Sequence, residues 1–361
     1  MIKKSARPGS RRGFQEEPID FAIAWVDGSD SEWRAVKQKY DSSQAHWANA
    51  GEQRYRDWGL LKYWFRAVEK HAPWVRRVHF ITWGHIPDWL NTDYPKLHVV
   101  KHEDYIPVEY LPTFSSHTIE LNLHRIPDLA QQFVYFNDDM FLNRSVSEQA
   151  FFANGLPRDV AALNTHCYAL SSPIQLIAIR DVGVINDHFD FKASLKSNLG
   201  KWLRPSYGNL LLRTLPLLGC PRFPGFWQPH NAQPYLKKTF EEVWDAEPKI
   251  LDATCRHRFR EETDVNQWVM REWQIASGCF MPRPTSWSHV IHMSASAGPR
   301  ASADAVAREV NTGRVRLLCF NDTNVSRQDY EYCRQVTLSA FKTRYPQLSK
   351  FEKEAVSESD G

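Results

Sequence analysis

The sequence predicts an α/β protein with a Rossmann-like core, in which helices cover a mainly parallel sheet. Over residues 19–142, short apolar runs alternate with stretches whose apolar residues recur at helical spacing. Some of the apolar runs end in acidic residues, and the carboxyl ends of parallel strands are where α/β proteins bind ligands. At 361 residues and 42% hydrophobic, the chain can bury a sizeable core in one elaborated domain or about two.

The elements of this core follow in order along the chain. The run IDFAIAWV (19–26) ends at Asp27-Gly28 and predicts a buried strand that leads into a turn. Further strands are predicted at 77–83, 97–101 and 132–137, with a helix from about Thr118 to Leu123 that continues to or breaks near Pro127. Another helix, before the second strand, stops at Ala72-Pro73 and is predicted from apolar residues at helical spacing, namely Tyr55, Leu61, Trp64, Phe65 and Val68.

The second half of the chain is less regular. Prolines interrupt short apolar runs across 143–225, so we predict an inserted or acceptor-side subdomain there, mostly helical or irregular. Helices are predicted at 234–245 and at about 261–276, and a strand at 315–320. The expected divisions are a flexible basic leader (1–17), the first half of the core (18–142), the subdomain (143–225), the second half of the main domain (226–352) and a flexible tail (353–361).

Composition and charge exclude several classes of protein. The six cysteines are far apart and form no CxxC pair, which argues against a zinc knuckle or a disulfide framework. A formal charge of +3 is too small to indicate a nucleic-acid partner. No apolar run is long enough for a membrane helix and no secretory signal is present, so a cytoplasmic location is the default. The leader carries five basic residues, Lys3, Lys4, Arg7, Arg11 and Arg12. It is either solvated or in contact with an anionic membrane surface.

The segment FVYFNDDMF (133–141) carries the strongest chemical signal. Asp138 and Asp139 directly follow an apolar strand, and two carboxylates this close repel each other unless they share a proton or a cation. Hard divalent ions such as Mg²⁺ or Mn²⁺ prefer this oxygen-rich setting, and a diphosphate would supply the remaining ligands. The alternative is a turn or a helix N-cap built from Asn and Asp.

A second acidic turn, WVDGSDSEW (25–33), ends the first predicted strand. It places Asp27 and Asp30 around a glycine that allows close approach of the backbone. The first strand-to-helix turn of a doubly wound sheet is a usual contact for a nucleotide. The alternative is a tight turn followed by a helix N-cap.

Three polar residues lie within one helical turn in the segment LPTFSSHTIELNLHRIP (111–127). Glu120 and His124 are four residues apart and share a helix face, and Arg125 is next to them. Glu120 and His124 form either an acid/base or phosphate-orienting pair, or a surface salt bridge. The sequence favours neither alternative.

Two later segments add a histidine and several arginines. His230 lies in a loop flanked by prolines, GFWQPHNAQPY (225–235), where an imidazole can be aimed, although a lone loop histidine is more often incidental. Arg256, Arg258 and Arg260 precede a predicted helix, and guanidinium groups suit phosphate oxygens in a bidentate manner. The alternative for the arginines is a solvated basic turn with acidic neighbours.

Taken in order, these segments resemble the conserved regions of the Stealth family of bacterial capsular polysaccharide phosphotransferases. The first region is similar to IDFAIAWVDGSDSEW, and the second is similar to the stretch from RYRDWGLLKYWF to QFVYFNDDMFL. The third is similar to QPHNAQPYLKKTFEEVW with RHRFREETDVNQW, and the fourth to CFNDTN with FKTRYPQLSKFE. The resemblance covers about residues 19–352 and is weakest at 143–225.

The resemblance implies an enzyme that transfers a hexose or N-acetylhexosamine 1-phosphate from a UDP-sugar to a glycan hydroxyl and releases UMP. It also implies a nucleotide-sugar-binding core like that of fold-A glycosyltransferases. We expect His230 to be the general base, helped by Glu120 and Asp139, and Mg²⁺ or Mn²⁺ to bind Asp138, Asp139 and Asp322. The residues expected to bind substrate are Asp27, Asp30, Arg125, Arg258 and Arg260.

Two other functions stay open at this point. A metal-dependent glycosyltransferase would use the same acidic strand end and the same donor, but it would release UDP. A non-catalytic nucleotide-sugar or glycan-binding module would bind ligand without turnover. The expected partners are a UDP-sugar and an oligo- or polysaccharide acceptor, with peripheral association to the membrane or to a capsule-export system.

Overall fold

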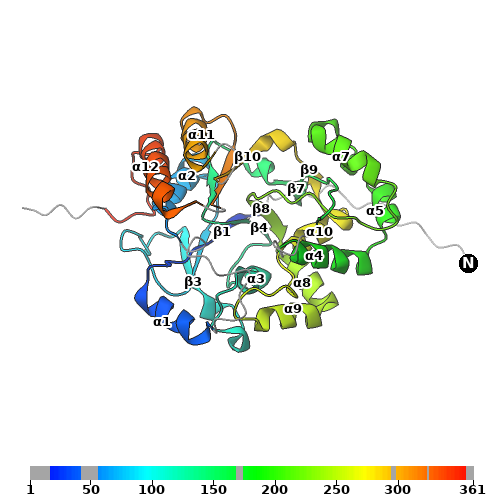
Figure 1. The fold of residues 1–361 in the computed structure, drawn as a ribbon, viewed down its shortest axis with the longest axis horizontal. Coiled ribbons are helices and arrows are strands. Elements are labelled where there is room, and N and C mark those ends of the chain that lie inside the picture. The colour runs from blue at the N-terminus through cyan, green and yellow to red at the C-terminus, as the bar shows by residue number, and fades with distance from the viewer. Residues whose placement is uncertain (1–16, 42–55, 168–173, 294–297, 323–324, 355–361) are drawn as a thin grey trace, which may run out of the picture.

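The computed structural model describes residues 17–41, 56–167, 174–293, 298–322 and 325–354. The predicted leader and tail therefore fall almost wholly outside the described residues, as does Tyr55. Helices surround a central sheet, as Figure 1 shows, and the chain returns to that sheet late in the sequence.

The central sheet has five strands in the order β3-β2-β1-β4-β8 (Figure 1). β1 to β4 pair in parallel, and β8 is antiparallel to β4 at the edge of the sheet. The first four strands lie inside the predicted runs, so the Rossmann-like α/β core is confirmed. The bounds are Ile19–Ala24 for β1, Val78–Thr82 for β2, Leu97–Lys101 for β3, Gln132–Phe136 for β4 and Gln233–Leu236 for β8.

The helices of the first half follow several of the predicted signals, although the third begins and ends about two residues earlier than predicted. α1 (Ser31–Tyr40) starts after Asp30, whose carboxylate accepts a hydrogen bond from the amide of Trp33. α2 (Leu61–His71) ends directly before Ala72-Pro73. α3 (Ser116–Leu121) is followed by a 3-10 turn at Leu123–Arg125, so the helix does break before Pro127.

Two smaller sheets complete the β structure of the described residues. One has the order β10-β11-β5, with β10 at Ser288–His292, β11 at Leu317–Asn321 and β5 at Met140–Leu142. β11 confirms the strand predicted at 315–320. The other sheet has the order β6-β7-β9, with bounds Phe152–Ala153, Leu156–Asp159 and Met281–Pro282.

Two of the predicted helices begin later than expected. Residues 234–236 belong to β8, and α8 occupies only Lys237–Ala246, since β8 pairs with β4 at the sheet edge, where Pro234 is tolerated. The helix predicted at about 261–276 is α10 (Trp268–Ala276). It starts late because Asp264 accepts a hydrogen bond from the amide of Glu261 and so holds a turn.

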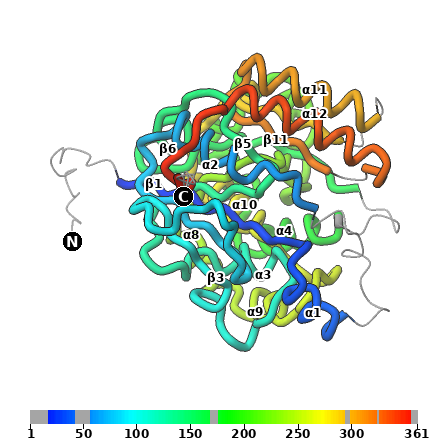
Figure 2. Tube along the Cα trace, turned by 90° about the vertical axis from the view of Figure 1, so that its left-hand side faces the viewer, coloured from blue at the N-terminus to red at the C-terminus, as the bar shows by residue number. Residues whose placement is uncertain are grey.

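Three helices were not predicted. α9 (Pro248–Arg256) precedes the Asp264 turn. α11 (Pro299–Thr312) and α12 (Arg327–Arg344) pack along each other over the β10-β11-β5 sheet (Figure 2).

The region from 174 to 217 is mainly helical, as the sequence predicted. Its helices are α4 (Ile174–His188), α5 (Phe191–Ser197), α6 (Leu199–Trp202) and α7 (Asn209–Leu217). They pack around an apolar cluster that includes Trp202, Tyr207 and Phe226, and that residues 160–163 and α10 also help to form. That 143–225 is a separate acceptor-side unit stays a prediction. Within the described ranges, no helix has the length and apolar character needed to cross a membrane.

The central sheet is stabilised by aromatic packing around Phe21 of β1. The Phe21 side chain is fully buried, and its ring centroid lies 4.8 Å from that of Phe136, 5.5 Å from that of Phe151 and 5.6 Å from that of Trp74. Because these rings are closely packed, they cannot easily move to fill the space that a smaller side chain at position 21 would leave.

Replacing Phe21 by alanine is expected to lower the free energy of unfolding by about 3 to 5 kcal/mol, because the buried ring would leave a cavity. Urea unfolding measures the loss. Val108 is 82% exposed and serves as the control. The change Val108→Ala should alter the free energy of unfolding by less than about 0.5 kcal/mol. A similar loss in both variants would contradict the role given to Phe21.

Candidate active site

The turn between β4 and β5 carries the paired carboxylates. Asp138 and Asp139 lie between the end of β4 and the start of β5. The amide of Phe320 on β11 donates a hydrogen bond to the backbone carbonyl of Asp139, with 3.2 Å between N and O. The turn is therefore held at the junction of the central sheet and the β10-β11-β5 sheet.

Asp139 and His230 lie 91 positions apart in the sequence and are in contact in the fold, with 2.9 Å between Asp139 Oδ2 and His230 Nε2. The pairing of β8 with β4 explains this contact. Because the two strands are antiparallel and Tyr135 is opposite Gln233, the segment before β8 lies beside the turn after β4. Burial disfavours a charged imidazole, but the carboxylate of Asp139 outweighs that effect and raises the pKa of His230. The predicted convergence of these two residues is present.

The acidic turn has the properties of a divalent cation site. Asp139 Oδ1 is buried and has no hydrogen-bond partner among the described residues. Loss of hydration, together with the negative charges of Asp139 and Asp57, raises the pKa of Asp138 to about 7, although Asp138 keeps an exposed surface. A bound cation would give Asp139 Oδ1 a partner. It would also relieve the repulsion between the carboxyl group of Asp138 and its acidic neighbours. The residues therefore fit a hard divalent ion.

Two further residues flank this turn. The Sγ of Cys319 on β11 lies within 4.8 Å of the ligand atoms of Asp139 and His230. Burial, together with the negative charge of Asp139, raises the pKa of Cys319, so the thiol stays protonated, and a neutral sulfur suits Mg²⁺ poorly. Asp322 faces Arg56 instead, with 3.8 Å between Oδ2 and Nη1. Because no described contact joins Asp322 to the acidic turn, we leave it out of the proposed cation site.

Glu120 is a buried carboxyl group whose environment includes His230. It is 5% exposed, and its Oε1 accepts a hydrogen bond from the hydroxyl of Tyr135 at 3.4 Å. Burial raises the pKa of Glu120 to about 8, against the opposing effects of Tyr135, the positive charge of His230 and a hydrogen bond from Ser116. Glu120 is therefore mostly protonated at neutral pH.

The structure corrects both alternatives for Glu120 and His124. Since α3 ends before His124, the two residues do not share a helix face. His124 stacks on Phe240 with 5.8 Å between ring centroids, and burial lowers the pKa of His124 to about 3. Arg125 is exposed and lies over Trp244, 4.9 Å from the ring centroid. No described contact connects Arg125 with the acidic turn, so we do not include it in the site.

Arg258 and Arg260 lie beside the helix that carries Glu120. Arg260 Nη2 donates a hydrogen bond to Ser116 Oγ at 2.5 Å, and Ser116 is one of the groups that oppose the rise in the pKa of Glu120. Arg258 Nη1 is buried and has no hydrogen-bond partner among the described residues. An anion would satisfy this unused donor. The arrangement suits the phosphate-binding role that the sequence predicted for both arginines.

Asp264 holds the arginine segment against α3. Its fully buried carboxylate contacts His117 Nδ1 on α3 at 2.9 Å and His257 Nδ1 in the arginine segment at 2.7 Å. One buried carboxylate thus joins the two elements that carry Glu120 and Arg258. Sequence reasoning did not single out Asp264.

A large pocket opens at the carboxyl ends of β2 and β3. Its volume is about 490 Å³, and its lining includes Asp30, Trp83, His85, Lys101 and His102. The Nδ1 atoms of His85 and His102 are buried and have no hydrogen-bond partner among the described residues. The pocket therefore combines an aromatic side chain with two unused imidazole nitrogens.

The first acidic turn borders this pocket. Asp27 Oδ1 accepts hydrogen bonds from the amide and hydroxyl of Ser29, at 2.8 and 2.6 Å. The amide of Asp27 donates a hydrogen bond to His85 Nε2 at 2.8 Å, and Asp30 is both the N-cap of α1 and part of the pocket wall. The sequence predicted either a nucleotide contact or a tight turn with a helix N-cap, and the turn and N-cap are present. Asp30 also lines the pocket, so it has a second structural role.

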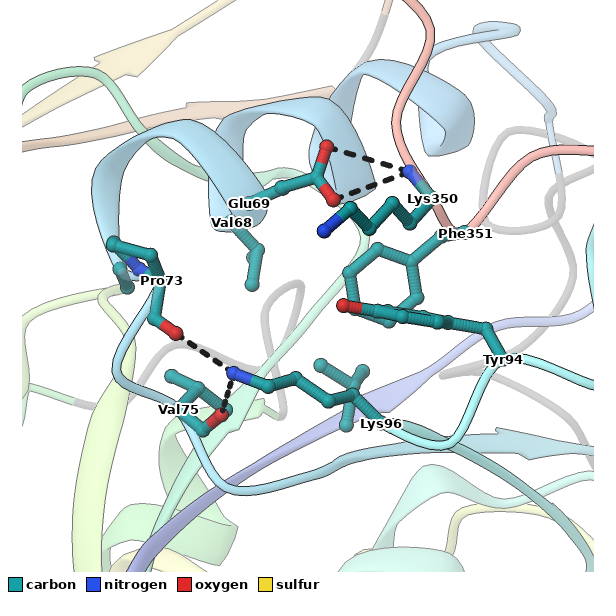
Figure 3. A pocket seen from close by; sticks show the side chains of 10 residues that line it. Val68, Glu69, Pro73, Val75, Tyr94, Lys96, Lys350 and Phe351 are labelled. Carbon is teal, nitrogen blue, oxygen red and sulfur yellow. Dashed lines mark hydrogen bonds between the residues drawn. The ribbon is translucent and has the colours of Figure 1, made fainter.

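A smaller pocket of about 190 Å³ lies at the opposite, amino-terminal ends of β2 and β3 (Figure 3). Its polar groups bond one another. Lys96 Nζ donates hydrogen bonds to the carbonyls of Pro73 and Val75 at 2.7 and 2.9 Å, and Glu69 accepts from the amide of Lys350 at 3.2 Å. None of its lining residues has a buried, unpartnered polar side-chain atom. We therefore place the candidate site at the carboxyl ends of the strands.

Sequence reasoning missed several residues of this site for different reasons. His85 and His102 closely follow β2 and β3, so polar residues after a predicted strand were an available signal. Asp57 follows no strand, and Cys319 lies inside an apolar run. Neither of these last two positions carries a local pattern that indicates function.

Replacing Glu120 by glutamine is expected to stabilise the folded protein at neutral pH. The pKa of Glu120 is about 8 in the folded protein and near 4.5 in an exposed glutamate, so the wild type loses stability as the pH rises between these values. Glutamine removes this cost, which is about 3 kcal/mol at pH 7. Thermal unfolding from about pH 4 to pH 8 measures the difference, which should vanish at the acidic end. A difference that does not vary with pH would contradict the raised pKa.

Known relatives of the chain form one family. The models for Stealth protein conserved region 1 and conserved region 2 match residues 17–45 and 54–159. Capsular polysaccharide phosphotransferase WcwK of Streptococcus pneumoniae is 39% identical over 93% of this chain and 99% of its own length. Receptor polysaccharide phosphotransferase WefC of Streptococcus gordonii is 38% identical over 93% of this chain and 99% of its own length.

Among solved structures, the galactosyltransferase LgtC in complex with donor and acceptor sugar analogs aligns with 92% of this chain and 98% of its own. The sequence identity is 10% and the TM-score is 0.39. The identity to the two relatives extends over nearly their full lengths, and the two conserved regions match where the sequence predicted them. The chain therefore belongs to the Stealth family and is a phosphotransferase.

Proposed function

We propose that the protein transfers a hexose or N-acetylhexosamine 1-phosphate from a UDP-sugar to a glycan hydroxyl in the synthesis of a capsular or cell-surface polysaccharide. The proposal rests on the 2.9 Å contact between Asp139 and His230, beside a buried carboxylate oxygen that lacks a partner. Arg258 adds a guanidinium whose buried Nη1 has no partner among the described residues. A cation site, a base and an anion-binding group are what phosphoryl transfer requires.

The donor is proposed to lie across the carboxyl ends of the strands. Trp83 would offer a face to the base, and His85 and His102 would offer their unused Nδ1 atoms. The end of β4 is two strands away from β2, a distance of about 10 Å at ordinary strand spacing. A nucleoside in the pocket could thus place its diphosphate near Asp138 and Asp139.

His230 is proposed to act as the base for the acceptor. With Nε2–H donated to Asp139, Nδ1 carries the lone pair that takes the proton of the acceptor hydroxyl. The acceptor oxygen then bonds the β-phosphorus, the bond from that phosphorus to the bridging oxygen breaks, and UMP leaves with the bridging oxygen. Arg258 and Arg260 would neutralise charge on the non-bridging oxygens, and Glu120 would orient His230 or the sugar.

Asp138 and Asp139 would hold Mg²⁺ or Mn²⁺. When bound, such an ion neutralises charge on the oxygens of the diphosphate. The support for this assignment is the buried, unpartnered Oδ1 of Asp139 and the raised pKa of Asp138.

A cytoplasmic location, peripheral to the inner face of the cell membrane and close to capsule export, is also part of the proposal. Its support in the sequence is the basic leader, which lies outside the described residues.

The released nucleotide tests the reaction. The purified protein is incubated with a panel of UDP-sugars, Mg²⁺ and candidate oligosaccharides, and the nucleotide is identified by chromatography while ³¹P spectra report a new phosphodiester. We expect UMP together with a phosphodiester, and loss of both when a chelator removes the metal. Release of UDP would identify a metal-dependent glycosyltransferase instead. Donor binding without any release would identify a binding module.

Replacing His230 by alanine is expected to lower kcat by at least about 100-fold, because the acceptor would lose its base. Binding of the UDP-sugar, measured by calorimetry, should stay within a few-fold of the wild type. His289 has a side chain that is 52% exposed, and His289→Ala serves as the control with unchanged kcat. Unchanged turnover in the His230 variant would remove this residue from the mechanism.

A further inference from the structure

A long stretch of the chain contains no acidic residue. Although 42 of the 361 residues are Asp or Glu, none of them falls between 191 and 240. The part of this stretch at 191–225, which we call the basic lobe, comprises α5, α6, α7 and the segment that follows them. Its cations are Lys192, Lys196, Lys201, Arg204, Arg213 and Arg222.

The cations of the basic lobe are available to an outside partner. All except Lys201 are exposed, and none of the six forms a salt bridge with a carboxylate in the described part of the chain. Their internal contacts are with neutral groups, such as the bonds of Lys192 to the carbonyl of Leu218 and of Arg213 to Asn164 Oδ1. Within the described residues, the lobe therefore presents cations that no salt bridge pairs with a carboxylate.

The same lobe also carries leucines whose side chains are exposed to solvent and not buried in a core. Leu212 and Leu215 of α7 are 68% and 45% exposed, and they are three residues apart, so they share one face of the helix. The opposite face holds the helix in place, because Thr214 is buried and its Oγ1 accepts a hydrogen bond from the amide of Leu163. Leu199 of α6 is 49% exposed. Apolar side chains left in water on a lobe that also exposes unpaired cations favour a binding surface over a packing role.

We propose that the basic lobe docks on an anionic lipid surface, with Leu212 and Leu215 inserted among the acyl chains and the flanking cations on the headgroups. A short helix with an apolar face and basic neighbours is the type of element that lies in a membrane interface. Cations near such a surface each add to the attraction. A polyanionic glycan would use the cations alone, and it would leave the exposed leucines without a role.

The position of the lobe suits this docking. Figure 1 shows α5 and α7 at the edge of the molecule away from α1 and α12. The lobe leads directly into the segment that carries His230, because Gly225 at its end is followed by FWQPH (226–230). Docking would thus hold the proposed acceptor side of the site near the membrane. The inference names the surface for the proposed peripheral location and does not depend on the chemistry of transfer.

Vesicle binding tests the proposal. The full-length protein is sedimented with vesicles of phosphatidylcholine that contain about one-third phosphatidylglycerol, at low and at high salt. We expect binding that weakens in pure phosphatidylcholine and at high salt. The double change Leu212→Glu and Leu215→Glu should lower the partition coefficient at least about tenfold, because two carboxylates would replace the inserted side chains.

The matched control places the same two charges elsewhere. Val108 and Leu348 are 82% and 57% exposed, so Val108→Glu with Leu348→Glu has the same net charge and should bind vesicles as the wild type does. Equal loss in the two double variants would overturn the proposal, because binding would then follow net charge or the leader. Unchanged binding by the leucine variant would overturn it as well.

Two other results would assign the lobe to a different partner. Binding to polyphosphate without binding to vesicles would assign it to an anionic glycan. A dimer in light scattering that the leucine variant dissolves, again without vesicle binding, would assign it to a second copy of the chain. Thermal unfolding checks that each variant is folded. Because vesicle binding is measured without substrates, its failure is distinguishable from a failure of phosphotransfer, which the released nucleotide reports.

Discussion

The proposed chemistry depends on the pairing of β8 with β4. β4 runs parallel to its other neighbour and ends at the acidic turn, whereas β8 runs in the opposite direction and begins at the same edge of the sheet. The segment before β8 must therefore lie beside the segment after β4, and this places His230 against Asp139. A helix at 234–236 would have no such partner. The contact between His230 and Asp139 is thus a consequence of strand direction. The backbone brings the two residues together, and the hydrogen bond between their side chains fixes the final orientation.

The site contains charges and donors that the protein alone does not satisfy. Asp139 Oδ1 and Arg258 Nη1 are buried without partners among the described residues, and burial raises the pKa of Glu120. A buried polar group without a partner destabilises the folded state, and so does a carboxyl group whose pKa is raised by burial. Each of these groups therefore lowers the free energy of unfolding. A cation between the carboxylates and a diphosphate near the arginine would remove much of that cost. The destabilising groups are therefore the same groups that would recognise the substrate.

The two sides of the site come from different parts of the chain. The pocket at the ends of β2 and β3, with His85 and His102, belongs to the first half and is proposed for the donor. The segment that carries His230 belongs to the second half and directly follows the basic lobe in the chain, so the acceptor is proposed to arrive from that side. Asp264 links the halves again, since it bonds His117 on α3 and His257 in the arginine segment. Donor and acceptor would then meet at the acidic turn, where both halves contribute side chains.

The sequence by itself determined the parallel strands β1 to β4, the end of α2 before Pro73 and the position of the acidic turn directly after β4. These features are local, because apolar periodicity and turn residues act within a few positions of one another. Only the tertiary structure decided that β8 is a strand, that Asp322 faces Arg56 and that Cys319 and Asp57 lie near the carboxylates. Each of these outcomes joins segments that are far apart in the chain. Such contacts follow from strand pairing and packing, and they leave no periodic pattern in either segment.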